Sequence, residues 1–192
     1  MRSLPGTPID RLLTAMLLIG PVLYLVADAL YATRGWDDPA AGVVHVLGAA
    51  GYAFVLLRLV TWSDGMPAAV LLVVGVLGVA GNVAYGFDTI HVSLGDTDLV
   101  DATGAAAGLI KPLGLCFPLT LLVAAFALRR RQPGWVVAVL AVAGVAWPVA
   151  HIANVGWLAV LVNAVLVATF GAIALAAGRR TPVTDHPLTQ PA

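Results

Sequence analysis

Eight ionisable or amide side chains lie within or beside the long apolar runs of this sequence, and their types define the chemistry open to this chain. Carboxylates and imidazoles can exchange protons or bind cations, and a buried ammonium can bind an anion or neutralise a carboxylate. Lys111 is the only lysine, and we expect it to pair with Asp28 or Asp88 unless it extends to the membrane surface. The eight residues are Asp28, His45, Asp88, His91, Lys111, His151, Asn154 and Asn163.

Asp88 and His91 are one helical turn apart, which is the spacing in this sequence most typical of a metal site. Together with His45 they form a candidate ligand set for a divalent metal. No HExxH pattern accompanies them, and the single cysteine, Cys116, excludes a cysteine-based zinc site and an internal disulfide. Histidines that only hydrogen-bond to neighbours, or His45 and His151 as axial ligands of a b-type haem, are alternatives. The cofactor therefore stays open.

The composition indicates that much of the apolar surface faces lipid. The 192 residues are 60% hydrophobic and 10% charged, and their mean hydropathy is +0.96. A soluble domain carries roughly a quarter charged residues, so this chain has too little polar surface to cover a soluble core. The formal net charge is zero, which removes the electrostatic attraction that nucleic acid requires. We therefore expect membrane lipid, and no nucleic acid, as a partner.

Long apolar runs separated by short polar breaks predict an all-α, polytopic membrane protein, a bundle of six transmembrane helices in one domain. Each run is long enough to cross a hydrocarbon core of roughly 30 Å. Gly104 and Gly108 in the fourth run predict a close contact between helices. We expect the polar segment 178–192 to be a disordered cytoplasmic tail. The predicted spans are about residues 12–31, 41–62, 68–91, 103–128, 135–153 and 155–177.

The arginines predict the orientation of these helices. If the spans alternate in direction, one side of the membrane holds eight arginines, whereas the other holds Arg34 and a group of aspartates. Positive residues favour the cytoplasmic side. We therefore predict a multi-pass protein of the plasma membrane with cytoplasmic N- and C-termini. The eight arginines are Arg2, Arg11, Arg58, Arg129, Arg130, Arg131, Arg179 and Arg180.

With this orientation all eight polar residues fall in the outer half of the membrane, and the inner half is aliphatic apart from terminal arginines. Charged groups inside a bilayer cost at least a few kcal/mol each, so they face the bundle interior or water and usually pair. Tyr24 and Tyr85 share helix faces with Asp28 and Asp88. We predict one outward-facing pocket lined by Asp28, His45, Asp88, Lys111, His151, Asn163, Tyr24 and Tyr85.

Such a pocket favours a protein that binds or transports a small polar ligand or cation. The apolar inner half argues against a simple channel. One alternative is a membrane-embedded enzyme that uses histidine and aspartate as acid–base groups or metal ligands. Another is a structural membrane subunit whose polar residues lock helices together. The sequence is compatible with a homo-oligomer and does not identify catalytic residues or the ligand.

Overall fold

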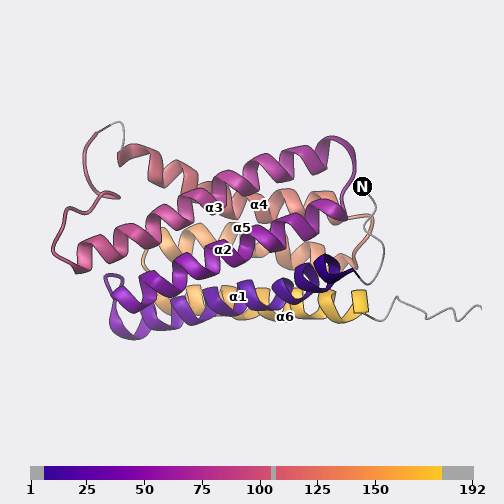
Figure 1. The fold of residues 1–192 in the computed structure, drawn as a ribbon, viewed down its shortest axis with the longest axis horizontal. Helices are drawn as coiled ribbons and strands as arrows, with labels where there is room; N and C mark the ends of the chain where they lie inside the picture. The colour runs from indigo at the N-terminus through magenta and orange to yellow at the C-terminus, as the bar shows by residue number, and fades with distance from the viewer. Residues whose placement is uncertain (1–6, 105–106, 179–192) are drawn as a thin grey trace, which may run out of the picture.

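The computed structural model describes residues 7–104 and 107–178 as an all-helical bundle (Figure 1). Six helices in these residues are long and apolar enough to cross a membrane, and no strand occurs among them. The six-helix membrane bundle predicted from the sequence is therefore confirmed. The predicted tail lies outside the described residues, except for Gly178. The helices are α1 (Pro8–Arg34), α2 (Pro39–Thr61), α3 (Gly65–Ser93), α4 (Ile110–Leu128), α5 (Gly134–Ile152) and α6 (Gly156–Gly178), and the 3-10 helix η1 (Ala107–Leu109) precedes α4.

The helices form a closed ring in chain order. Each helix packs on the one before it and the one after it, and α6 returns to pack on α1. Their directions alternate, so each end of the bundle collects its own loops (Figure 1). We call one end the acidic end; its loops carry Asp37, Asp38, Asp96, Asp98 and Asp101. The opposite end, which we call the arginine end, carries Arg11, Arg58, Arg129, Arg130 and Arg131.

Local sequence explains where the first two helices begin. The Thr7 hydroxyl accepts a hydrogen bond from the backbone nitrogen of Asp10 at 3.1 Å, and the Asp38 carboxylate accepts one from Ala41 at 2.8 Å. A proline follows each of these caps, at a position where its missing N–H is not needed. Gly35 ends α1 with a φ of 103°, a conformation that favours glycine. Gly35 and the Asp38 cap therefore fix the turn between α1 and α2 at the acidic end.

Glycine allows α3 and α4 to approach each other closely. A Cβ on Gly81 would lie 2.3 Å from the backbone nitrogen of Gly114, so no side chain fits there. The close contact predicted at Gly104 and Gly108 is wrong, because a Cβ on either residue would meet no described neighbour within 4 Å. Both residues precede α4, which begins at Ile110 and not near residue 103.

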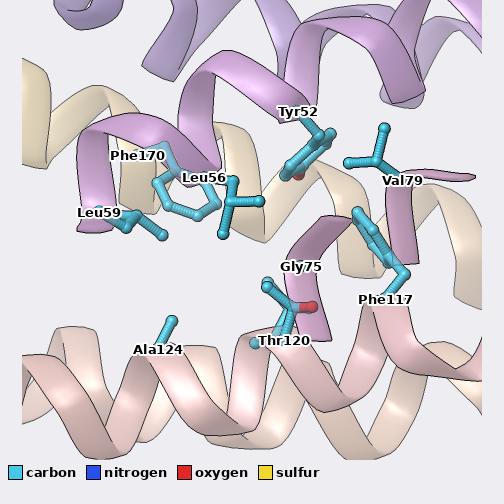
Figure 2. Close-up of a pocket in the computed structure, with 10 residues that line it drawn as sticks. Tyr52, Leu56, Leu59, Gly75, Val79, Phe117, Thr120, Ala124 and Phe170 are labelled. Atoms are coloured by element: carbon cyan, nitrogen blue, oxygen red, sulfur yellow. The ribbon is translucent and has the colours of Figure 1, made fainter. Parts of the chain in front are cut away.

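Apolar and aromatic side chains fill the ring between the polar residues of the acidic end and the arginine end. The rings of Tyr52 and Phe117 meet edge to face with centroids 4.9 Å apart, and Phe117 stacks on Tyr24 at 5.2 Å. Tyr52, Phe117 and Phe170 line a hollow of ≈ 20 Å³, which is room for about one water molecule (Figure 2). This packing closes the interior of the ring between the polar residues and the arginine end.

Candidate functional site

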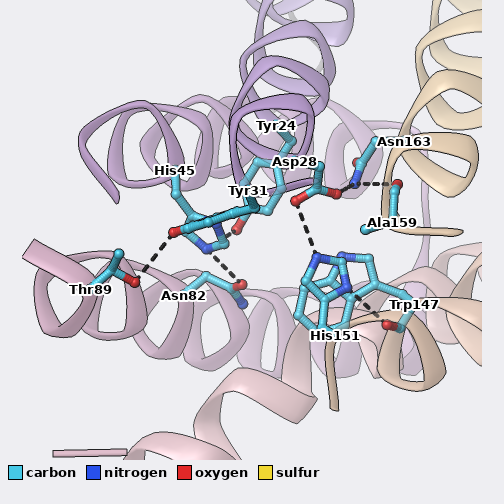
Figure 3. Close-up of polar contacts among 10 residues, drawn as sticks. All are labelled: Tyr24, Asp28, Tyr31, His45, Asn82, Thr89, Trp147, His151, Ala159 and Asn163. Carbon is cyan, nitrogen blue, oxygen red and sulfur yellow. Dashed lines mark hydrogen bonds and ion pairs between the residues drawn. The ribbon is translucent and has the colours of Figure 1, made fainter. Parts of the chain in front are cut away.

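Asp28 lies at the centre of a buried polar cluster that joins α1, α5 and α6 (Figure 3). Its side chain has no exposed surface. One carboxylate oxygen, Oδ2, accepts a hydrogen bond from Nδ2 of Asn163 at 2.6 Å, and the other, Oδ1, lies 3.3 Å from Nε2 of His151. Asn163 and His151 are 135 and 123 positions away in the sequence. They reach Asp28 because α6 closes the ring against α1.

The hydrogen bonds of His151 define where its protons must be. Nδ1 lies 2.9 Å from the backbone carbonyl oxygen of Trp147, which can only accept, so Nδ1 carries a hydrogen. Nε2 therefore faces Asp28 either as the second N–H of an imidazolium or as the bare acceptor of a neutral ring. In both cases one proton must lie between Nε2 and the carboxylate, because two bare lone pairs would repel. The Asp28–His151 contact thus holds one proton.

Asp28 has no guanidinium or ammonium partner among the described residues. Every ion pair that an arginine or the lysine makes in residues 7–104 and 107–178 goes to a different carboxylate. His151 is the one basic side chain in this part of the chain that pairs with Asp28. The charge of the cluster therefore depends on an imidazole, which can be neutral or cationic, and not on a permanent cation.

Aromatic rings enclose His151 near the acidic end. Trp147 stacks on the imidazole with ring centroids 3.9 Å apart, and Trp36, from the loop between α1 and α2, meets it edge-on at 5.9 Å. Trp36 in turn stacks on Tyr31 at 5.1 Å. The His151 side chain remains 8% exposed, whereas that of Asp28 is fully buried. His151 therefore lies between Asp28 and the surface at the acidic end.

A second polar group lies beside the first and joins α2 to α3. Nε2 of His45 is 3.3 Å from Oδ1 of Asn82 and 3.4 Å from the Tyr24 hydroxyl (Figure 3). The amide nitrogen of Asn82 donates to the carbonyl of Gly78 at 2.8 Å, so its oxygen faces His45. Nε2 of His45 is therefore the donor, and Nδ1 is left as a buried acceptor without a hydrogen bond in the described chain.

Tyrosines pack around these two groups. The ring of Tyr85 lies 5.4 Å from the His45 ring, and the Tyr24 ring lies 4.7 Å from it. The hydroxyl of Tyr31 is 3.3 Å from the hydroxyl of Thr89 on α3. The structure thus brings six of the predicted pocket residues together: Tyr24, Asp28, His45, Tyr85, His151 and Asn163.

Lys111 and Asp88 lie apart from this cluster. The Lys111 ammonium is 2.9 Å from Asp101, and its side chain is 57% exposed. The expected pairing of Lys111 with Asp28 or Asp88 is not formed, because α4 begins at Ile110 and leaves Lys111 in its first turn at the acidic end. Asp88 is buried, but its carboxylate serves the loop after α3, where it accepts hydrogen bonds from two backbone N–H groups.

The three candidate metal ligands make separate contacts. His45 bonds to Asn82, Asp88 binds the loop, and the exposed His91 lies 3.7 Å from Asp96. Within residues 7–104 and 107–178, no group of three or more histidine, cysteine, aspartate or glutamate side chains could hold a metal ion. The sequence spacing of Asp88 and His91 places them one turn apart on α3 without giving them a shared partner.

Sequence reasoning missed buried polar residues near both ends of the bundle. Asn82 lies one turn before Tyr85 on α3, so the position of Tyr85 could have identified it. At the arginine end, Arg58 pairs with Asp10 at 2.7 Å and donates to Thr14 at 3.0 Å. Thr7 and Asp10 also cap the start of α1, and nothing in their spacing points to an ion pair with α2. The half of the bundle at the arginine end is therefore not purely apolar.

No known protein family, curated protein or solved structure matches this chain. The chemistry must be inferred from the cluster itself. A fully buried carboxylate, an imidazole in contact with it and a shared proton form a site that can bind and release H⁺. Its polar atoms contact one another directly, which suits a ligand as small as a proton.

Proposed function

We propose that this chain is an integral membrane protein that binds a proton reversibly at the Asp28–His151 pair and couples its release to the binding or transport of a small polar ligand or cation. The observation that carries the proposal is the hydrogen bond from Nδ1 of His151 to Trp147. It commits Nδ1 as a donor, so the contact between Nε2 and Asp28 exists only while it holds a proton.

Loss of this proton would have a large electrostatic cost. With the proton bound, the pair is neutral overall, whether the proton belongs to the imidazole or to the carboxylic acid. Without it, one negative charge remains in a carboxylate that has no exposed surface and no arginine or lysine partner in the described chain. Burying an uncompensated charge costs several kcal/mol. Proton release must therefore accompany a structural opening or the entry of another cation.

The acidic end is the proposed entrance to this site. His151 lies one residue before the end of α5, and the loops around it carry the five aspartates that define the acidic end. These carboxylates would raise the local concentration of cations. The arginine bias across the bundle supports an extracytoplasmic position for this end. Packed side chains between the cluster and the arginine end support access from the acidic end.

Proton counting in lipid nanodiscs tests the proposal. The protein is moved between about pH 5 and pH 9, and protons released per chain are measured with a pH indicator dye. The wild type should release one more proton than Asp28→Asn. The asparagine can keep both contacts, since its amide oxygen can accept from Asn163 and its amide nitrogen can donate to a neutral His151. Equal proton counts for the two proteins would refute the proposal.

A structural membrane subunit is the second candidate. It is favoured by the direct contacts among the buried polar groups, which link α1, α2, α3, α5 and α6 as an interhelical lock would. In that case the Asp28–His151 contact would be a permanent feature. The same titration distinguishes the candidates, because a permanent lock would exchange no proton over this pH range. Asp96→Asn, which makes the same substitution at an exposed aspartate of the same end, provides the matched control and should release as many protons as the wild type.

A further inference from the structure

We propose that the last turn of α5, Pro148–Ile152, is a gate that the proton holds closed, and that loss of the proton opens the cluster to the acidic end. This inference rests on the proton site proposed above and adds the moving part. His151 is the only side chain of this turn whose polar atoms hydrogen-bond another helix in the described chain, through the contact with Asp28 on α1.

The backbone on both sides of this turn is suited to bending. Pro148 lies inside α5 and has no N–H, so the carbonyl of Gly144 receives no helical hydrogen bond from it. Beyond the turn, Asn154 adopts a φ of 53°, the left-handed conformation that few residues other than glycine occupy. Prolines are the usual sites of helix kinks. The turn is therefore bounded by a weakened helix and a sharp change of direction.

Few side-chain contacts hold the turn against the ring. Val149 is 53% exposed and Ile152 is 70% exposed, so both point away from the bundle. Ala150 is fully buried but contributes only a methyl group. His151, stacked on Trp147 and paired with Asp28, supplies the specific attachment. Breaking its contact with Asp28 would leave the turn attached mainly by stacking and the short α5–α6 link.

The surroundings of His151 identify Asp28 as its titratable partner. The polar neighbours on α1 are Asp28, Tyr24 and Tyr31, and α2 contributes His45. Asn163 on α6 does not titrate, and the Trp36 ring that meets His151 carries no charge. On α3, Tyr85 lies against His45, and tyrosines in water titrate near pH 10. His45 already donates to Asn82. Within this set, a proton lost from the Asp28–His151 contact is the change that separates α5 from α1.

Cysteine accessibility tests the gate. In a Cys116→Ala background, Ala159→Cys places a thiol on α6 at a fully buried position one turn before Asn163. Its reaction with a membrane-impermeant maleimide is timed in nanodiscs across the same pH range. Because the intrinsic reactivity of a thiol also rises with pH, each rate is divided by the rate of the same cysteine in an Asp28→Asn protein. That protein keeps the contact closed at every pH.

The expected ratio rises with pH, by up to about tenfold per pH unit, since opening is linked to the loss of one proton. His151→Phe keeps an aromatic ring on Trp147 but removes the contact with Asp28, so its rate should be high already at low pH. Ala124→Cys, fully buried deeper in the ring, should remain unreactive in both backgrounds. A flat ratio for Ala159→Cys, or a parallel rise for Ala124→Cys, overturns the gate. If Asp28-dependent proton release persists in that case, the proton site stands without it.

Discussion

The guanidinium of Arg58 lies 2.7 Å from the carboxylate of Asp10, and this buried pair joins the end of α2 to the first turn of α1. α1 therefore carries a buried carboxylate near each end. Asp10 faces a guanidinium, which stays charged at any physiological pH, whereas Asp28 faces an imidazole. Of these two buried pairs, only the one near the acidic end has a basic member that can also exist as a neutral side chain. Sensitivity to pH is thus expected there and not at the arginine end.

Arg58→Met should destabilise the bundle by up to about 3 to 5 kcal/mol, because it removes the guanidinium that pairs with the buried Asp10 carboxylate. The double variant with Asp10→Leu should recover much of this loss, since it removes both members of the pair. Chemical unfolding in detergent micelles measures both effects. The exposed pair of Arg131 and Asp64 is the control, and Arg131→Met should change the free energy of unfolding by less than about 1 kcal/mol. A double variant as unstable as Arg58→Met would contradict this account.

The thermal stability of the wild type should fall as the pH rises above about 6.5. Below that pH His151 also holds a proton in the unfolded chain, so this pair contributes no slope, whereas the buried neutral His45 lowers stability as the pH falls. Above it, only the folded Asp28–His151 contact retains the proton, and stability decreases by at most about 1.4 kcal/mol per pH unit. Asp28→Asn should lose this decrease. Melting curves of both proteins between about pH 6.5 and pH 9 check the sign, and an increase with pH in the wild type over this range would reverse the assignment.

Two glycines that face each other across α3 and α4 should respond differently to alanine. Gly81→Ala should cost roughly 1 to 3 kcal/mol, because the new Cβ would lie 2.3 Å from α4 backbone atoms. Gly114→Ala should be neutral or stabilise α4 by up to about 1 kcal/mol, because its Cβ would meet no described neighbour within 4 Å. Unfolding of the two single variants compares them directly. A Gly81→Ala variant as stable as the wild type would mean that α3 and α4 are farther apart than described.

Asp88→Ala should loosen the loop after α3. The carboxylate accepts hydrogen bonds from the backbone nitrogens of Leu99 at 2.8 Å and Val100 at 3.1 Å. Hydrogen bonds to charged groups contribute about 1.5 to 3 kcal/mol, so the two amides should exchange hydrogen roughly ten- to a hundredfold faster in the variant. Hydrogen-exchange mass spectrometry of the peptide that contains both residues measures this rate. Lys111→Met, which removes only the exposed pair with Asp101, should leave the exchange nearly unchanged.

The residues that contact one another inside the ring could be predicted only in part. Polar residues cost free energy in lipid wherever they lie in a span, so the cluster of Asp28, His45, His151 and Asn163 could be expected from residue type and depth. The residues of α3 that contact this cluster could not be predicted in the same way. Tyr85 and Asp88 were expected to face the pocket, whereas Asn82, Tyr85 and Thr89 make the contacts.

The amino-acid sequence alone determined the number of spans and their alternating direction, because a bilayer requires each crossing helix to have a long apolar run, of roughly 20 residues. It could not determine the rotation of each helix, since lipid-facing and buried surfaces are equally apolar and leave little periodicity to read. Only the tertiary structure determined this rotation, the start of α4 at Ile110 instead of near residue 103, and the packing of α6 on α1. These features place Lys111 at the surface, and they bring Asp28 to His151 and Asn163 across more than a hundred residues.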